Sequence, residues 1–97
     1  DRLAFSQEKA RRLAANLEHV LSRQSENKEL KLFPGAVRAH RLILSFSGLP
    51  GHLDELYMLI LAVRIGAMSA AVARATLATY PNDYATEGVI ETFLAAA

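Results

Sequence analysis

Residues 53–79 read LDELYMLILAVRIGAMSAAVARATLAT and include eight consecutive apolar residues, Leu56 to Val63. Apolar positions recur at spacings of three and four, which predicts one long helix that is apolar on more than one side. Such a helix needs cover on more than one side, and a chain of 97 residues has few other elements to supply it. We therefore expect a second copy, or another protein, to cover part of this helix.

Small residues recur every four positions along the expected helix, at Ala62, Gly66 and Ala70. This spacing forms a smooth ridge that lets two helices approach closely. Glycine costs about 1 kcal/mol relative to alanine inside a helix, so a break at Gly66 is the alternative. The residues expected in dimer or helix packing are Ile60, Val63, Gly66, Ala67, Met68 and Ala70.

Three further helices are expected. The first begins near Ser6 and carries apolar residues at helical spacing as far as Leu21, with Arg12 and Arg23 on its other faces. The second opens at Pro34, a residue favoured in the first turn, and ends at Ser47-Gly48. The last is short and is capped by Asp83 or Thr86.

No segment alternates apolar and polar residues as a half-buried strand would. The sequence therefore predicts a single all-α domain over residues 1–97. Its expected architecture is a small antiparallel helical bundle with one long central helix, assembled as a dimer.

Composition narrows the classes of function. The 11 basic and 10 acidic residues leave a net charge of +1, so no broad field attracts nucleic acid or an acidic membrane surface. Arg64 would lie near the middle of any membrane span through residues 56–73, at a cost of about 2.5–3.5 kcal/mol. We expect no membrane association and a cytoplasmic location.

Side chains typical of catalysis or metal binding form no recognisable pattern. The chain has no cysteine, and its three histidines, His19, His40 and His52, lie on separate expected elements without the spacing of a zinc site. The glycines lack the lysine of a phosphate-binding loop. We expect no enzyme activity, no cofactor and no metal.

Two classes of function besides protein binding remain compatible with the sequence. Ala62, Gly66 and Val72 have the spacing of a helix-turn-helix motif, but the second helix would offer a DNA groove mainly Arg74, Thr76 and Thr79. A DNA-binding regulator is therefore the alternative reading. A structural helix pair, free or associated with a membrane, is a third class. Such a protein would need detergent or would bind no transcriptional regulator.

Two local patterns carry a resemblance to a known family. One is the segment Ala36-Val37-Arg38-Ala39-His40-Arg41, and the other is Tyr57 followed eleven residues later by Met68-Ser69-Ala70. The first resembles a segment that opens a helix in the TraM-like family, small anti-activators of quorum-sensing transcription factors, and the second has the spacing found in that family's long helix. The rest of the chain matches poorly.

The resemblance implies a few antiparallel helices assembled as a homodimer, with no enzyme activity and no cofactor. It also implies a partner, a LuxR-type transcriptional regulator with a LasR-like ligand-binding domain, which the anti-activator keeps from acting on promoters.

An apolar surface flanked by the basic side chains of Arg38 and Arg41 would serve this purpose. Aromatic residues and arginine carry much of the energy of protein interfaces. This surface would cover the face by which the regulator dimerises, or distort its DNA-binding arrangement. Replacing Arg38 or Arg41 with glutamate is expected to weaken binding while the fold stays intact. The candidate partner-binding residues are Leu32, Phe33, Arg38, Arg41, Phe46, Leu49 and Tyr57.

Overall fold

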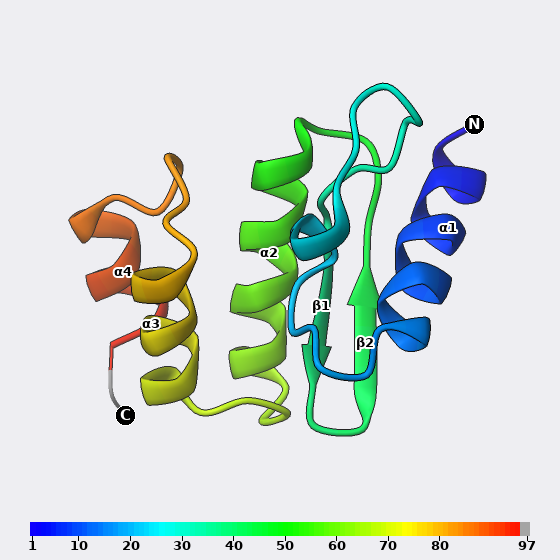
Figure 1. The fold of residues 1–97 in the computed structure, drawn as a ribbon. Helices are drawn as coiled ribbons and strands as arrows, with labels where there is room; N and C mark the ends of the chain where they lie inside the picture. The colour runs from blue at the N-terminus through cyan, green and yellow to red at the C-terminus, as the bar shows by residue number, and fades with distance from the viewer. Residues whose placement is uncertain (96–97) are drawn as a thin grey trace.

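The computed structural model describes residues 1–95, in which helices predominate (Figure 1). In chain order the elements are α1 (Arg2–Ala15), the short 3-10 helix η1 (Ser22–Ser25), strands β1 (Ala36–Ala39) and β2 (Leu42–Ser45), α2 (Gly51–Arg64), α3 (Ala70–Thr79) and α4 (Glu87–Phe93). The expectation of a mostly helical domain is confirmed. The prediction of an all-α bundle with one long central helix is wrong on two points.

The first error concerns residues 34–48, which form a β-hairpin where a helix was predicted. β1 and β2 pair in antiparallel register from Ala36↔Ser45 to Ala39↔Leu42, and His40 and Arg41 make the turn. Apolar runs this short fit a strand as well as a helix, so periodicity does not separate the two. Gly35 has a φ of +133°, a backbone conformation that keeps Pro34-Gly35 from opening a helix.

The hairpin lies between α1 and α2 (Figure 1). Alternate side chains of β1 point to opposite faces of the sheet. Val37 is fully buried and packs in one core cluster with Leu56 and Leu59 of α2. Arg38 faces the other way, and its Nη2 donates to the carbonyl of Leu13 in α1, 2.7 Å away.

The second error concerns the central helix, which divides into α2 and α3 at Gly66. Gly66 has a φ of +77°, and the backbone N–H groups of Ala67 and Met68 both donate to the carbonyl of Ala62. The side chain of Ser69 then caps α3 by accepting from the N–H of Val72. These end signals outweigh the continuous apolar pattern. Because Gly66 lies in the turn, the small residues form no continuous ridge.

Both ends of α1 also differ from expectation. The helix begins at Arg2, because the Asp1 side chain accepts from the N–H of Ala4, and it ends at Ala15. Leu17, expected on its buried side, is among the most exposed apolar residues. At the other end of the chain, Thr86 caps α4 by accepting from the N–H of Val89, so one of the two expected caps is confirmed. Within residues 1–95, no helix combines the length and hydropathy needed to cross a bilayer.

Gly66→Ala is expected to lower the free energy of unfolding by about 1–2 kcal/mol, because alanine at a φ of +77° is strained even though no atom lies within 4 Å of the added Cβ. Gly88→Ala in α4 is the matched control. Its added Cβ meets only Thr86 Oγ1 at 4.0 Å, so helix propensity should stabilise that variant by up to about 1 kcal/mol. Urea unfolding of both variants measures the difference, and a Gly66→Ala variant as stable as the wild-type chain would contradict the turn at Gly66.

Candidate functional site

The exposed face of α2 carries large apolar side chains. Leu56, Leu59 and Ala62 are buried on the opposite side, whereas Tyr57 is 52% exposed and Leu61 is 40% exposed. Both exposed residues belong to a stripe that ends at Arg64, at spacings of four and three. α2 therefore serves the core with one face and presents an apolar face with one cation to the outside.

This exposed face forms one side of a groove of about 440 Å³. The other side is the end of β2 and the connection into α2, where Phe46 is 45% exposed and Leu49 is similarly exposed. The groove, which we call the α2 groove, is lined by Phe46, Leu49, Tyr57, Met58, Ile60, Leu61 and Arg64. Arg64 is the one charged residue in this lining. The α2 groove therefore suits an apolar ligand surface better than a reacting small molecule.

A buried ion pair fixes the connection that supplies Phe46 and Leu49. Lys9 of α1 is 2% exposed, and its Nζ donates to the carbonyl of Phe46 at 2.9 Å and to Asp54 Oδ2 at 3.3 Å. The second carboxylate oxygen of Asp54 accepts from the N–H of Leu49 at 3.1 Å. Two residues 45 positions apart thus hold both groove residues by their backbone.

The close approach of the chain at this ion pair requires Gly35. A Cβ at that position would lie 2.5 Å from Lys9 Nζ and 2.9 Å from the carbonyl oxygen of Phe46. The positive φ of Gly35 also disfavours any other residue. The glycine that begins the hairpin therefore allows the pair to form.

Burial lowers the pKa of Lys9 below 10.5, and the nearby Asp54 carboxylate opposes this shift only in part. Between the lowered pKa and 10.5 the unfolded chain binds more protons than the folded one, so this lysine makes stability rise with pH. In Lys9→Met that contribution should be absent. Urea unfolding of both chains between neutral pH and pH 10.5 measures how the free energy of unfolding depends on pH. We expect this free energy to rise more steeply with pH in the wild-type chain than in Lys9→Met. Equal slopes would contradict the lowered pKa.

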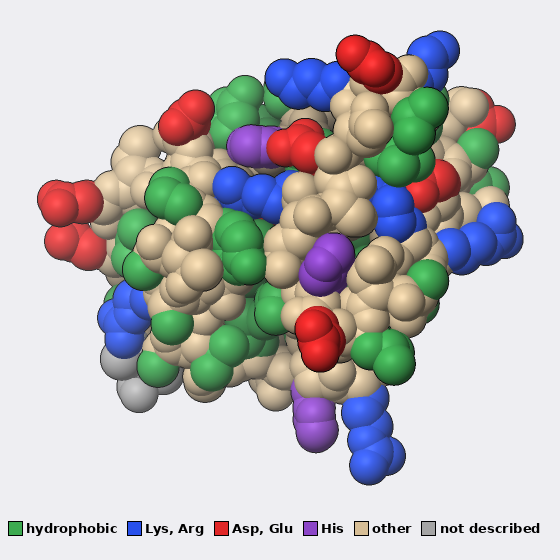
Figure 2. Space-filling model, in the orientation of Figure 1, with side chains coloured by type: hydrophobic (Ala, Val, Ile, Leu, Met, Phe, Trp, Pro, Cys, Tyr) green, Lys and Arg blue, Asp and Glu red, His purple; other side chains and the backbone are tan. Residues whose placement is uncertain are grey.

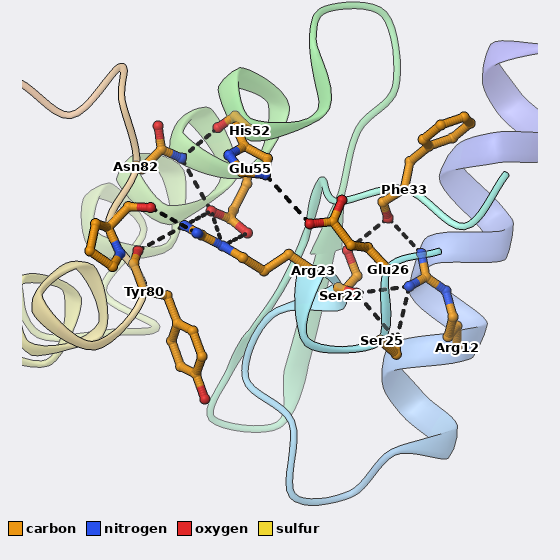
Figure 3. Close-up of polar contacts among 11 residues, drawn as sticks. Arg12, Ser22, Arg23, Ser25, Glu26, Phe33, His52, Glu55, Tyr80 and Asn82 are labelled. Atoms are coloured by element: carbon orange, nitrogen blue, oxygen red, sulfur yellow. Dashed lines mark hydrogen bonds and ion pairs between the residues drawn. The ribbon is translucent and has the colours of Figure 1, made fainter. Parts of the chain in front are cut away.

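A second buried network joins η1, α2 and the connection between α3 and α4 (Figure 3). Arg23 donates to both oxygens of Glu55, at 2.7–3.1 Å, and to the carbonyls of Tyr80 and Pro81, each at 2.7 Å. Asn82 Nδ2 donates to Glu55 Oε2 at 3.1 Å and to the carbonyl of His52. The Arg23 guanidinium balances the Glu55 carboxylate, and the donors of Arg23 and Asn82 have acceptors. We therefore assign this network a role in holding the fold together.

Arg12 holds a neighbouring set of polar contacts, also drawn in Figure 3, which fixes the backbone of Phe33. Its guanidinium donates to Ser25 Oγ and to the carbonyls of Ser22 and Phe33. The Phe33 ring packs edge-on against Phe5, with ring centroids 5.5 Å apart. Phe33 is therefore half-buried beside α1, where it lines two other hollows, and it does not lie in the α2 groove.

The structure brings together three of the seven predicted partner-binding residues, Phe46, Leu49 and Tyr57, in the α2 groove. Leu32 lies away from it, in an isolated bridge with Asn27. Arg38 bonds the carbonyls of Leu13 and His19 near the end of α1. A glutamate at position 38 would therefore disturb the fold as well as any binding. Arg41 is exposed in the hairpin turn.

The six predicted packing residues do not form one continuous ridge. Ile60 lines the α2 groove, while Val63, Met68 and Ala70 line a separate hollow of about 410 Å³ beside the turn between α2 and α3. Gly66 and Ala67 belong to the turn itself.

Titratable side chains form no reactive constellation in the part of the chain that the structure describes. Within residues 1–95, no three histidine, aspartate or glutamate side chains lie close enough to hold a metal ion. His52 Nε2 faces Glu26 Oε1 at 3.9 Å, an isolated pair at the surface.

Comparison with protein-family models, with curated proteins and with solved structures found no match.

Proposed function

We propose that this chain is a protein-binding anti-activator that engages its partner through the α2 groove. The observation that carries the proposal is the groove itself, an exposed apolar surface with one cation, built from Phe46, Tyr57 and their neighbours. Exposed apolar surface rimmed by polar residues typically marks a protein-binding site. Tyrosine, phenylalanine and arginine are enriched where such interfaces gain most of their energy.

Preorganisation favours the same conclusion. Binding loses affinity when it must first order flexible side chains and loops. The buried pair of Lys9 and Asp54 holds the backbone of Phe46 and Leu49 before any partner arrives. A short surface connection that merely joined β2 to α2 would not need two buried charges.

The TraM-like resemblance supplies the class of partner, a LuxR-type regulator with a LasR-like ligand-binding domain. The two segments that carry the resemblance adopt other structures here than in that family. Residues 36–41 form β1 and the hairpin turn, and Met68-Ser69-Ala70 spans the start of α3, separated from Tyr57 by the turn at Gly66. The α2 groove therefore carries the claim of protein binding. The resemblance contributes the anti-activator role and the LuxR-type partner, and it also implies a cytoplasmic location and a homodimer.

Displacement of the regulator from DNA tests this function. A purified LuxR-type regulator is bound to a labelled promoter fragment, and the chain is added in increasing amounts. We expect the DNA to be released by the wild-type chain and by Val72→Glu, whose site on α3 lies outside the groove. Leu61→Glu, which places a charge in the apolar groove, should release little. Retention of the DNA at saturating wild-type chain would refute the anti-activator function.

A DNA-binding regulator is the second candidate, because α2, the turn at Gly66 and α3 follow each other as in a helix-turn-helix motif. Against it, α3 carries a single basic residue, Arg74, and three of its six exposed residues are alanines. Val72, one of the three residues in the motif's spacing, is 52% exposed. On the face seen in Figure 2, positive and negative side chains are interspersed and form no basic field. Duplex binding whose affinity falls steeply with salt would favour this candidate.

A further inference from the structure

The two edges of the hairpin differ in their hydrogen bonding. Phe46 N–H donates to the carbonyl of Gly35, so Phe46, Leu44 and Leu42 direct their backbone groups toward β1. The same alternation directs the backbone N–H and C=O groups of Ile43 and Ser45 away from β1. β2 therefore presents two donors and two acceptors at its outer edge.

The corresponding edge of β1 is covered. Arg38 N–H donates to the carbonyl of Val20 at 2.7 Å, and Ala36 N–H donates to Ser22 Oγ at 3.0 Å. Figure 1 shows the segment that carries η1 passing across the hairpin. Within residues 1–95, the backbone groups of Ile43 and Ser45 have no comparable partner. An edge left open in this way is a template for another strand.

The α2 groove adjoins this open edge. Leu42, Leu44 and Phe46 point to the sheet face that α2 covers, because Leu44 is directly opposite Val37, which packs on Leu56 and Leu59. Phe46 lines the groove, and Leu42 at the other end of β2 is 49% exposed. A strand added beside β2 would place every second side chain on this apolar face.

We propose that β2 accepts an extended segment of the partner as an additional antiparallel strand, with apolar side chains at alternate positions over the α2 groove and a carboxylate at Arg64. This inference deepens the proposed function and rests on it for the identity of the partner. The carboxylate follows from charge complementarity, because Arg64 is the one charged group in the groove lining. Strand addition also pairs the backbone groups of Ile43 and Ser45, which a docked helix leaves unpaired.

Amide hydrogen exchange of the full chain, followed by NMR, tests the inference with two probes. One is a LuxR-type ligand-binding domain. The other is the acetylated and amidated peptide Val-Thr-Val-Thr-Val-Thr-Glu, whose valines alternate and whose glutamate would lie toward Arg64 in an antiparallel arrangement. We expect the amides of Ile43 and Ser45 to exchange rapidly in the free chain and at least tenfold more slowly with either probe. Leu44, already bonded to β1, should change little.

A pair of variants separates backbone pairing from side-chain packing. Ile43→Pro removes the outward N–H and leaves the bonds between β1 and β2 in place, whereas Ile43→Ala loses the same packing but keeps the N–H. With circular dichroism confirming that both fold, we expect the proline variant to bind at least tenfold more weakly than the alanine variant. If the proline variant does not fold, exchange in the wild-type chain decides.

The outcomes distinguish the two proposals. Protection of Ile43 and Ser45 by the regulator domain supports both. Regulator binding without that protection would overturn strand addition, pointing to a docked helix, and would leave the anti-activator function standing. Protection by the peptide alone supports strand addition and refutes the regulator as partner. Absence of protection by either probe overturns the inference.

Discussion

Arg23→Met is expected to lower the free energy of unfolding by about 3–5 kcal/mol, the usual effect of leaving one partner of a buried ion pair alone. The Glu55 carboxylate is 1% exposed and would keep only the amide of Asn82 as a donor. The carbonyls of Tyr80 and Pro81 would lose their bonds to the guanidinium as well. A domain of this size is stabilised by roughly 5–15 kcal/mol in total, so the loss is a large part of it.

Thermal and urea unfolding measure this effect, and Arg11→Met is the matched control, because Arg11 is exposed on α1. The control should change the free energy of unfolding by at most about 0.5 kcal/mol. A second variant that replaces both Arg23 and Glu55 with apolar residues should recover part of the loss, since no buried charge then lacks a partner. Equal stability of Arg23→Met and Arg11→Met would show that the network contributes nothing.

Tyr57→Ala is expected to weaken partner binding by at least about 2 kcal/mol, or roughly 30-fold in Kd. Tyr57 lies in the α2 groove and is more than half exposed, so its removal costs contact area in the complex and little core packing. The free energy of unfolding should change by less than about 1 kcal/mol.

Titration calorimetry against a LuxR-type ligand-binding domain measures this change in affinity. Val72→Ala is the matched control, because Val72 is as exposed as Tyr57 but lies on α3, outside the groove. The control should bind like the wild-type chain. Equal losses in the two variants would mean that the α2 groove is not the contact surface.

Helices with clear local signals were predictable from the sequence. The apolar run before Arg64 and the Thr86 cap lie in helices where expected. The hairpin is not predictable from periodicity, because each strand has only four residues and residues 36–46 do not alternate strictly. The sequence allows both a continuous helix and a break at Gly66, since the choice depends on the cap at Ser69 and on the packing of Ala73 and Leu77 into the core.

The candidate site likewise combines residues that the sequence indicates with contacts that only the tertiary structure sets. The sequence identifies Phe46, Leu49 and Tyr57 as candidate partner-binding residues, but their convergence in one groove depends on the hairpin. Lys9 and Asp54 resemble ordinary surface charges in the sequence, and nothing local indicates that residues 45 positions apart form a buried pair. Pairing at this separation is set by tertiary structure. The dipeptide Pro34-Gly35 gave one weak sequence signal, because Pro-Gly is typical of a turn. In the structure Gly35 has a positive φ and opens no helix.

Light scattering of the chain, alone and mixed with a purified LuxR-type ligand-binding domain, tests whether the α2 groove binds this partner. We predict a defined species of larger mass in the mixture with the wild-type chain, and its mass gives the stoichiometry. The same mixture with Leu61→Glu should show only the separate components. Unchanged masses with the wild-type chain, or a complex that Leu61→Glu forms equally well, would contradict the claim.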